Sequence, residues 1–173
     1  MHTNTWAALE ENMRISFEGP TVLVRDINAS RRFYETVLGQ ELLADHGPHL
    51  AFRAGFFLWQ ADGALPLMRP GAEAQAGPLG RDNFEMYFEC AELDEAWAAC
   101  EAAGAPAAHP IVEQPWGQRG FRVLDPDGHV VEVAEPLSAL VRRLMAQGLD
   151  AAAVAERTSI PLGMVRELAG ERD

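Results

Sequence analysis

The stretch Asp125-Pro126-Asp127-Gly128-His129-Val130-Val131-Glu132-Val133 decides how this sequence folds. Proline at the second position and glycine at the fourth position of its first four residues are typical of a tight turn. Apolar residues recur on both sides of the turn, in residues 120–124 and 129–134. The pattern predicts two antiparallel strands that are joined by the turn.

The predicted hairpin closes the second of two copies of one pattern. In each copy a strand-like run is followed by a helical pattern that stops at a glycine, and then by three short strand candidates. The first copy consists of a strand at Thr21–Val24, a helix that stops at Gly39, and strands at 41–44, 49–53 and 56–60. The second copy consists of a strand at Phe84–Cys90, a helix that stops at Gly104, and strands at 107–112, 120–124 and 129–134. We therefore predict two βαβββ modules, at residues 15–63 and 83–135, with an N-terminal segment at 1–14, a linker at 64–82 and a helical extension at 136–173.

Two such modules belong to the α+β class, and each has one helix-covered sheet face and one open face. Placed side by side, the two sheets are expected to curl into an open, cup-shaped barrel whose concave faces form one cavity. Alternation along a strand then sorts the side chains. It points Glu85, Tyr87 and Glu89 of the fifth strand into the cup, and Glu132 of the last strand with them.

The charge of the chain excludes several classes of function. Among 173 residues, 26 acidic and 14 basic side chains give a net charge of −12, and every basic residue except histidine is arginine. The absence of lysine excludes a Schiff base and a Walker-type phosphate site. An acidic chain is repelled by nucleic acid and by anionic membranes. Because neither a secretory signal nor an apolar run of membrane-spanning length is visible, we expect a cytoplasmic protein.

Several segments of the two predicted modules resemble the vicinal oxygen chelate superfamily, which includes glyoxalase I, bleomycin-resistance proteins and extradiol dioxygenases. The resemblance covers roughly residues 15–135. The segments that carry it are Val24-Arg25-Asp26, Phe33-Tyr34, Leu38-Gly39, Phe84-Glu85-Met86-Tyr87-Phe88, Leu93-Asp94, Ala103-Gly104 and, above all, the stretch 125–133.

The resemblance implies a divalent metal that is held by one inward residue from the first and the last strand of each module, usually His or Glu. The second module supplies Glu85 and Glu132 at these positions, whereas the first module supplies Gly19 and, only with a shifted register, Gln60. The implied cofactor is thus a divalent metal (Mg, Mn, Zn, Fe or Ni) with an incomplete ligand set. Two carboxylates without histidine suit zinc or iron poorly and a hard ion such as Mg²⁺ better.

Without a metal, the expected cavity lining is aromatic and acidic. The candidate ligand-binding residues are Trp59, Tyr87, Trp116 and Arg119, and the candidate catalytic residues are Glu132 and Glu85. Trp116 either stacks on a ligand or caps apolar surface, and Trp59 either lines the cavity or lies in the core.

The two carboxylates also allow two interpretations. In an apolar cup one of them is expected to have a raised pKa, so that it could act as a general base next to a carbonyl group. Alternatively, Glu85 and Glu132 form a buried ion pair with Arg119 or Arg122.

The sequence after Pro136 is helical throughout, with predicted helices at 137–147, 151–157 and 162–168. Its pattern resembles the helix-turn-helix of resolvases and sigma-like regulators. From Leu137 onward, however, acidic and basic side chains balance, and the would-be reading helix carries only Arg166, beside Glu167. We therefore favour an appendage that packs on the barrel or on a second subunit over a DNA-binding module.

The sequence thus favours a protein that binds a small organic molecule, neutral or cationic, in a resistance or sequestration role. The alternative is a metal-dependent lyase, isomerase or dioxygenase of the glyoxalase type with an atypical metal site. A ligand-sensing, DNA-binding regulator is a third and weaker hypothesis. The expected partners are a small organic ligand and a second copy of the chain in a homodimer, with neither membrane nor nucleic acid.

Overall fold

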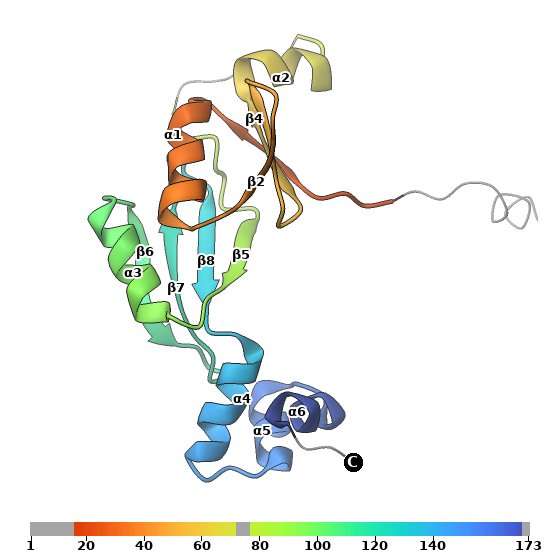
Figure 1. Cartoon of the computed structure of the whole chain (residues 1–173), viewed down its shortest axis with the longest axis vertical. Helices are drawn as coiled ribbons and strands as arrows, with labels where there is room; N and C mark the ends of the chain where they lie inside the picture. Colours follow the sequence, from red (N-terminus) through yellow and green to blue (C-terminus); the bar gives the residue numbers. More distant parts are fainter. Residues whose placement is uncertain (1–15, 72–76, 171–173) are drawn as a thin grey trace, which may run out of the picture.

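The structure, a computed structural model, describes residues 16–71 and 77–170. Three parts follow one another along its longest axis (Figure 1). The first sheet lies at one end, the second sheet lies in the middle, and a group of three helices lies at the other end.

The first module contains β1 (Thr21–Val24), α1 (Ile27–Arg32), η1 (Phe33–Val37), β2 (Leu42–Asp45), β3 (His49–Phe52) and β4 (Phe56–Gln60). Its strands form a sheet in the order β1-β4-β3-β2, in which β1 is parallel to β4. The Asp26 carboxylate begins α1, because it accepts hydrogen bonds from the backbone N–H groups of Asn28 and Ala29. The helix continues without a break into η1, a π-helical turn.

The second module repeats this arrangement with β5 (Glu85–Glu89), α3 (Leu93–Ala102), β6 (Ala107–Glu113), β7 (Arg119–Leu124) and β8 (Val130–Ala134). The strand order is β5-β8-β7-β6, and β5 is parallel to β8. The turn between β7 and β8 is held by Asp125, whose Oδ1 accepts the N–H groups of Asp127 and His129. The predicted two-module α+β fold is confirmed, and the two sheets do not join into a closed barrel.

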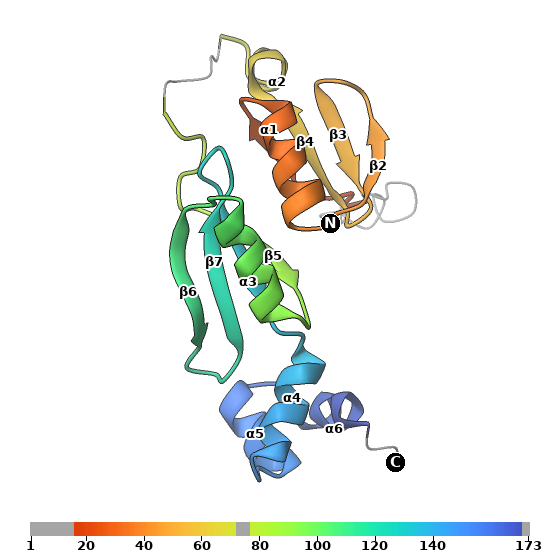
Figure 2. The ribbon, with the colours of Figure 1, turned by 60° about the vertical axis from the view of Figure 1, so that its left-hand side comes forward.

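The two modules share one hydrophobic core. Helices α1 and α3 lie on the same side of the two sheets (Figures 1 and 2), and apolar side chains from both modules form one buried cluster beneath them. A buried polar contact crosses the junction as well. The Tyr34 hydroxyl donates to Asp125 Oδ2 at 3.0 Å, and burial together with this carboxylate raises the pKa of Tyr34. The modules therefore pack as one unit.

One helix lies where the sequence predicted only a linker. Helix α2 (Ala61–Met68) follows β4 directly and crosses the expected boundary between residues 63 and 64. Its small residues Ala61 and Ala64 are fully buried, which lets the helix pack closely on β4 and β1. The predicted boundaries of the two modules themselves stay predictions.

The extension consists of α4 (Leu137–Ala146), α5 (Ala151–Thr158) and α6 (Leu162–Ala169), as the sequence predicted within one or two residues. Its side chains Leu140, Val141, Leu144, Val154 and Val165 form a second core that is separate from the core of the modules. Among the described residues, no helix is long and apolar enough to cross a membrane.

Candidate ligand-binding face

The open face of the second sheet carries a row of polar side chains in register. Tyr87 of β5 lies opposite Glu132 of β8, which lies opposite Arg122 of β7, which lies opposite His109 of β6. Residues opposite one another on neighbouring strands share one face of a sheet. The core residues Val131 and Val133 alternate with Glu132 and point to the helix side. We call this row, together with Glu85, Trp116 and Gln118, the ligand face.

The centre of the ligand face is an ion cluster in which one arginine joins two carboxylates. Arg122 donates from Nη2 to Glu132 Oε2 at 2.8 Å, and from Nε to Glu85 Oε2 at 2.8 Å. Its Nη1 lies 3.2 Å from His109 Nε2. The Glu132 side chain is only 8% exposed, whereas that of Glu85 is 38% exposed. Of the two ion pairs that the sequence allowed, the structure forms the one with Arg122.

Burial separates the protonation behaviour of the two carboxylates. Desolvation and the nearby charge of Glu85 raise the pKa of Glu132, although the Arg122 guanidinium opposes this shift. The hydrogen bonds from Arg122 hold the pKa of Glu85 below its ordinary value. Glu132 is therefore the member of the pair that more readily takes up a proton.

Arg119 lies outside this cluster, contrary to its expected place in the cavity lining. Odd-numbered residues of β7 point to the helix side, as buried Phe121 and Val123 do. The Arg119 guanidinium accordingly lies 3.6 Å from Asp94 of α3. Because of this alternation we leave Arg119 out of the ligand face.

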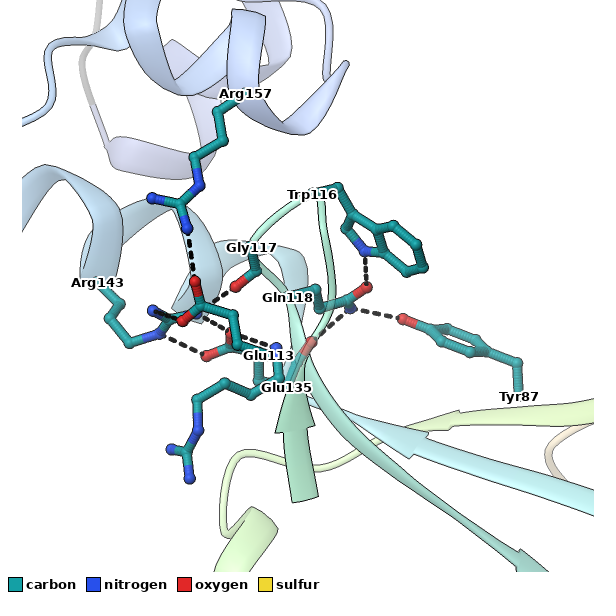
Figure 3. A network of polar contacts seen from close by, with 9 residues as sticks. Tyr87, Glu113, Trp116, Gly117, Gln118, Glu135, Arg143 and Arg157 are labelled. Carbon is teal, nitrogen blue, oxygen red and sulfur yellow. Dashed lines mark hydrogen bonds and ion pairs between the residues drawn. The ribbon is translucent and has the colours of Figure 1, made fainter. Parts of the chain in front are cut away.

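Two aromatic side chains at the rim of the face are joined through a glutamine (Figure 3). Gln118 donates from Nε2 to the Tyr87 hydroxyl at 3.0 Å, and its Oε1 accepts from Trp116 Nε1 at 3.2 Å. The Tyr87 hydroxyl in turn donates to Glu89 at 3.0 Å. Burial, the largest cause, raises the pKa of Tyr87 to about 12, so that the phenol stays neutral at physiological pH. Trp116 and Tyr87 remain 40% and 48% exposed, which leaves ring surface for a ligand.

Trp59 lies on the open face of the first sheet rather than in the core. Its neighbour Leu58 is fully buried on the helix side, whereas the Trp59 ring meets His49 edge-on at 5.6 Å. In the part of the chain that the structure describes, no hydrogen bond, ion pair or ring contact joins Trp59 to the ligand face. The structure thus separates Trp59 from the other predicted ligand-binding residues.

The donor set does not fit a divalent metal. Gly19 provides no side chain, and a Cβ atom there would come within 1.8 Å of the Gly55 carbonyl oxygen, so no larger residue fits. Gln60 alternates with Trp59 and therefore lies on the other face of β4. The remaining carboxylates, Glu85 and Glu132, both bind Arg122, whose positive charge opposes a cation at the same place. Within residues 16–71 and 77–170, no group of three or more His, Cys, Asp or Glu side chains is placed to hold a metal ion.

Residues 17–138 match the family model of the glyoxalase-like domain. The chain belongs to this glyoxalase-like family. No curated protein sequence matches it. A protein of unknown function from Agrobacterium tumefaciens str. C58 is 37% identical, with a TM-score of 0.65, and the match covers 73% of this chain and 98% of the other. A glyoxalase/bleomycin resistance protein/dioxygenase from Nocardioides is 25% identical, with a TM-score of 0.56 over 75% of this chain and 88% of that one.

A lactoylglutathione lyase from Agrobacterium tumefaciens is also similar to the glyoxalase-like chain, at 25% identity and a TM-score of 0.50, over 69% of this chain and 92% of the other. The family match ends at residue 138, two residues into α4. Most of the helical extension therefore lies outside the part of the chain that defines the family.

The rim of the ligand face of this glyoxalase-like chain is exposed at Tyr87 and Trp116. Three cavities of about 390–440 Å³ lie where the two modules meet, and none of them is lined by Tyr87, Trp116 or Glu132. The expected homodimer stays a prediction.

Gln118 and His109 also belong to the ligand face, although neither was expected there from the sequence. Gln118 is only 6% exposed, and its side chain forms hydrogen bonds with Trp116, with Tyr87 and with the backbone carbonyl of Glu135. Counting outward in steps of two from Arg122 would have placed Gln118 on the same face. His109 follows from no such count, because β6 and β7 are out of regular register on both sides of it.

Proposed function

We propose that the ligand face binds a small, planar organic molecule, neutral or cationic, without a metal ion. The observation that carries this proposal is the Glu85–Arg122–Glu132 cluster, in which a guanidinium joins the two carboxylates that the family resemblance assigned to a metal. With Glu89, which accepts from the Tyr87 hydroxyl, the face carries three carboxylates and one guanidinium, a net charge of −2. Such a surface repels anions and attracts cations.

The two rim aromatics support a planar ligand. Their polar ends are occupied, because Trp116 Nε1 and the Tyr87 hydroxyl both bind Gln118. Each ring is thereby fixed at one edge while part of its surface stays exposed. Aromatic surfaces bind planar rings by stacking and bind cations through the ring quadrupole. The similarity to a structure named glyoxalase/bleomycin resistance protein/dioxygenase supports a resistance or sequestration role.

A second candidate function is proton transfer by Glu132 in a lyase- or isomerase-type reaction. The observation that favours it is the raised pKa of this buried carboxylate, which suits a general base next to a carbonyl group. The similarity to a lactoylglutathione lyase supports the same direction. Exchange of the carbon-bound protons of hydroxyacetone in D₂O tests this candidate. Glu132→Gln would abolish such exchange, whereas the control Glu101→Gln, on the exposed side of α3, would leave it unchanged.

The binding proposal is tested by calorimetric titration with three probes of similar ring size and different charge. These probes are 1-methylquinolinium, which is cationic, quinoline, which is neutral at about pH 8, and 2-naphthoate, which is anionic. We expect saturable binding of 1-methylquinolinium, weaker binding of quinoline and no binding of 2-naphthoate.

Tyr87→Ala or Trp116→Ala should weaken binding of the cation about tenfold, as expected for the loss of roughly 1.4 kcal/mol. Phe17→Ala removes an exposed aromatic ring outside the ligand face and serves as the matched control. Equal binding of all three probes, or of none, would contradict the proposal.

A further inference from the structure

The helical extension reaches the ligand face through two arginines. The turn between β6 and β7, residues 114–118, carries Trp116 and Gln118. Arg143 of α4 and Arg157 of α5 approach this turn from the extension, while the chain from Trp116 through Gln118 to Tyr87 lies on its other side (Figure 3). The turn thus lies between the extension and the rim aromatics.

Arg143 binds the backbone of the turn, the last residue of β6 and the residue that follows β8. Its Nη2 donates to the Gly117 carbonyl at 2.6 Å, and Nη2 and Nε donate to the two carboxylate oxygens of Glu135 at 2.5 and 3.2 Å. Its Nη1 donates to Glu113 at 3.2 Å. Glu135 is only 7% exposed, so these bonds hold a buried charge. A guanidinium is well suited to this role, because its donors are fixed in one plane.

Arg157, on the second helix of the extension, binds the same Glu113 carboxylate as Arg143. Its Nη2 donates to Glu113 Oε1 at 2.5 Å. Its side chain also fills the space beside Gly117, where an added Cβ atom would lie 3.1 Å from Arg157 Nε. Gly117 has a φ of +94°, which favours glycine at this position independently of the contact.

Polar contacts, rather than a common apolar core, join the extension to the second module. The cluster of Leu140, Val141, Leu144, Val154 and Val165 is separate from the core of the two modules. Within the described residues, the hydrogen bonds and ion pairs of these two arginines hold the extension against the turn, in addition to the chain connection at residues 135–136. The family match ends at residue 138, so α5 with Arg157 and the part of α4 with Arg143 are additions to the family fold.

We propose that the extension is part of the ligand site, and that Arg143, assisted by Arg157, is a positioning residue that fixes the turn and thereby sets Trp116 and Gln118 against Tyr87. The inference rests on the proposed function only for the statement that these aromatics touch a ligand. Loosening the extension then weakens ligand binding without removing any side chain that the ligand contacts.

The test uses the full chain labelled with 5-fluorotryptophan, in which Trp116→Phe assigns the Trp116 resonance. Arg143→Ala and Arg157→Ala should shift or broaden this fluorine resonance and speed hydrogen exchange of the amides at 114–118. Arg143→Lys retains the charge but not the planar set of donors, so it should restore the resonance only in part. The matched control is Arg142→Ala, since the exposed Arg142 lies next to Arg143 and, among the residues that the structure describes, bonds only to Ser138 of its own helix.

Binding of 1-methylquinolinium by the same variants gives a second readout. Arg157→Ala and Arg143→Ala should weaken binding about tenfold, a loss of about 1.4 kcal/mol, and Arg142→Ala should leave it unchanged. Arg143→Ala leaves the buried Glu135 carboxylate without an arginine, so the fold of this variant is checked by circular dichroism. If Arg143→Ala does not fold, Arg157→Ala alone tests the inference. An unchanged Trp116 resonance, or unchanged affinity in variants that bind the probe, would overturn the inference. A wild-type protein that binds none of the probes would contradict the proposed function instead, and the fluorine resonance alone then decides whether the extension positions the turn.

Discussion

Replacement of Arg122 by methionine should destabilise the protein in a strongly pH-dependent way. Methionine keeps much of the volume of the arginine stem but removes the guanidinium that joins Glu85 and Glu132. The Glu132 side chain is 8% exposed and would become a buried, unpaired carboxylate beside a second one. Removing one partner of a buried pair is far more costly than removing both, because the remaining charge stays desolvated.

The magnitude follows from the exposure of the two carboxylates. Breaking a buried pair costs about 3–5 kcal/mol, and we take the lower end because Arg122 itself is 23% exposed. The contact with Glu85, which is 38% exposed, adds at most about 1 kcal/mol. The free energy of unfolding should therefore fall by about 3 kcal/mol at about pH 8.

The pH dependence has a definite sign. The pKa of Glu132 is already raised in the folded protein, so its protonated form favours folding, and this contribution is lost as the pH rises through the folded pKa. Without Arg122, which lowers that pKa, the loss becomes larger. The pKa of Glu85 is lowered by Arg122, and the stability that this shift supplies above the ordinary pKa also disappears. Both effects make the variant least stable relative to wild type at high pH. Near pH 4.5 the destabilisation should fall to about 1 kcal/mol, the value of the lost hydrogen bonds.

Urea unfolding of wild type and variant, followed by circular dichroism between about pH 4.5 and 8, measures these values. The double variant Arg122→Met with Glu132→Gln should recover about 2 kcal/mol of the loss at high pH, because it removes the unpaired charge. Arg53→Met serves as control, since Arg53 and Glu41 form a pair that is 58% and 68% exposed, and its effect should stay within about 0.5 kcal/mol. A loss that is the same at both pH values, or no recovery in the double variant, would refute the reasoning.

Three further predictions concern other parts of the molecule. Tyr34→Phe removes only the buried hydrogen bond to Asp125 and should lower the free energy of unfolding by about 1.5–3 kcal/mol in urea; a loss under about 0.5 kcal/mol would contradict the importance of this contact between the modules. In the same variant Tyr87 is the remaining tyrosine, and its tyrosinate absorbance should appear with a pKa of about 12. The free energy of unfolding should fall as the pH rises from 10 toward that value, and ionisation near 10 would contradict the buried environment of the phenol. Leu144→Ala should destabilise the extension by about 2–5 kcal/mol, and hydrogen exchange should speed up in α4–α6 while the sheets keep their protection; equal loss in both would contradict separate cores.

Much of the fold was predictable because local signals agree with the tertiary arrangement. The turn at Asp125–Gly128 and the alternation of Val131, Glu132 and Val133 set both a strand and the face on which each side chain lies. Helix α2 escaped prediction, because Gly63 and Pro66 are typical of a loop, whereas burial of Ala61 and Ala64 against the first sheet favours a helix. This part of the structure depends on tertiary packing, which a local pattern does not contain.

The candidate site was predictable in part, and the errors follow from how it is built. The alternation along β5 and β8 was enough to place Glu85, Tyr87 and Glu132 on one face. Arg119 was expected in the cavity lining because of the loop before it, whereas the alternation along β7 puts it on the same side as buried Phe121 and Val123. Arg143 could not be connected to the site at all, because its contact with Gly117 joins residues that are far apart in the sequence.

Binding of 1-methylquinolinium before and after treatment with a chelator tests the central claim most directly, when combined with metal analysis of the same purified protein. We predict less than stoichiometric metal and one binding site whose affinity chelation leaves unchanged, because Arg122 rather than a metal ion joins Glu85 and Glu132. One bound metal ion per chain, together with binding that chelation abolishes and the metal restores, would contradict the account.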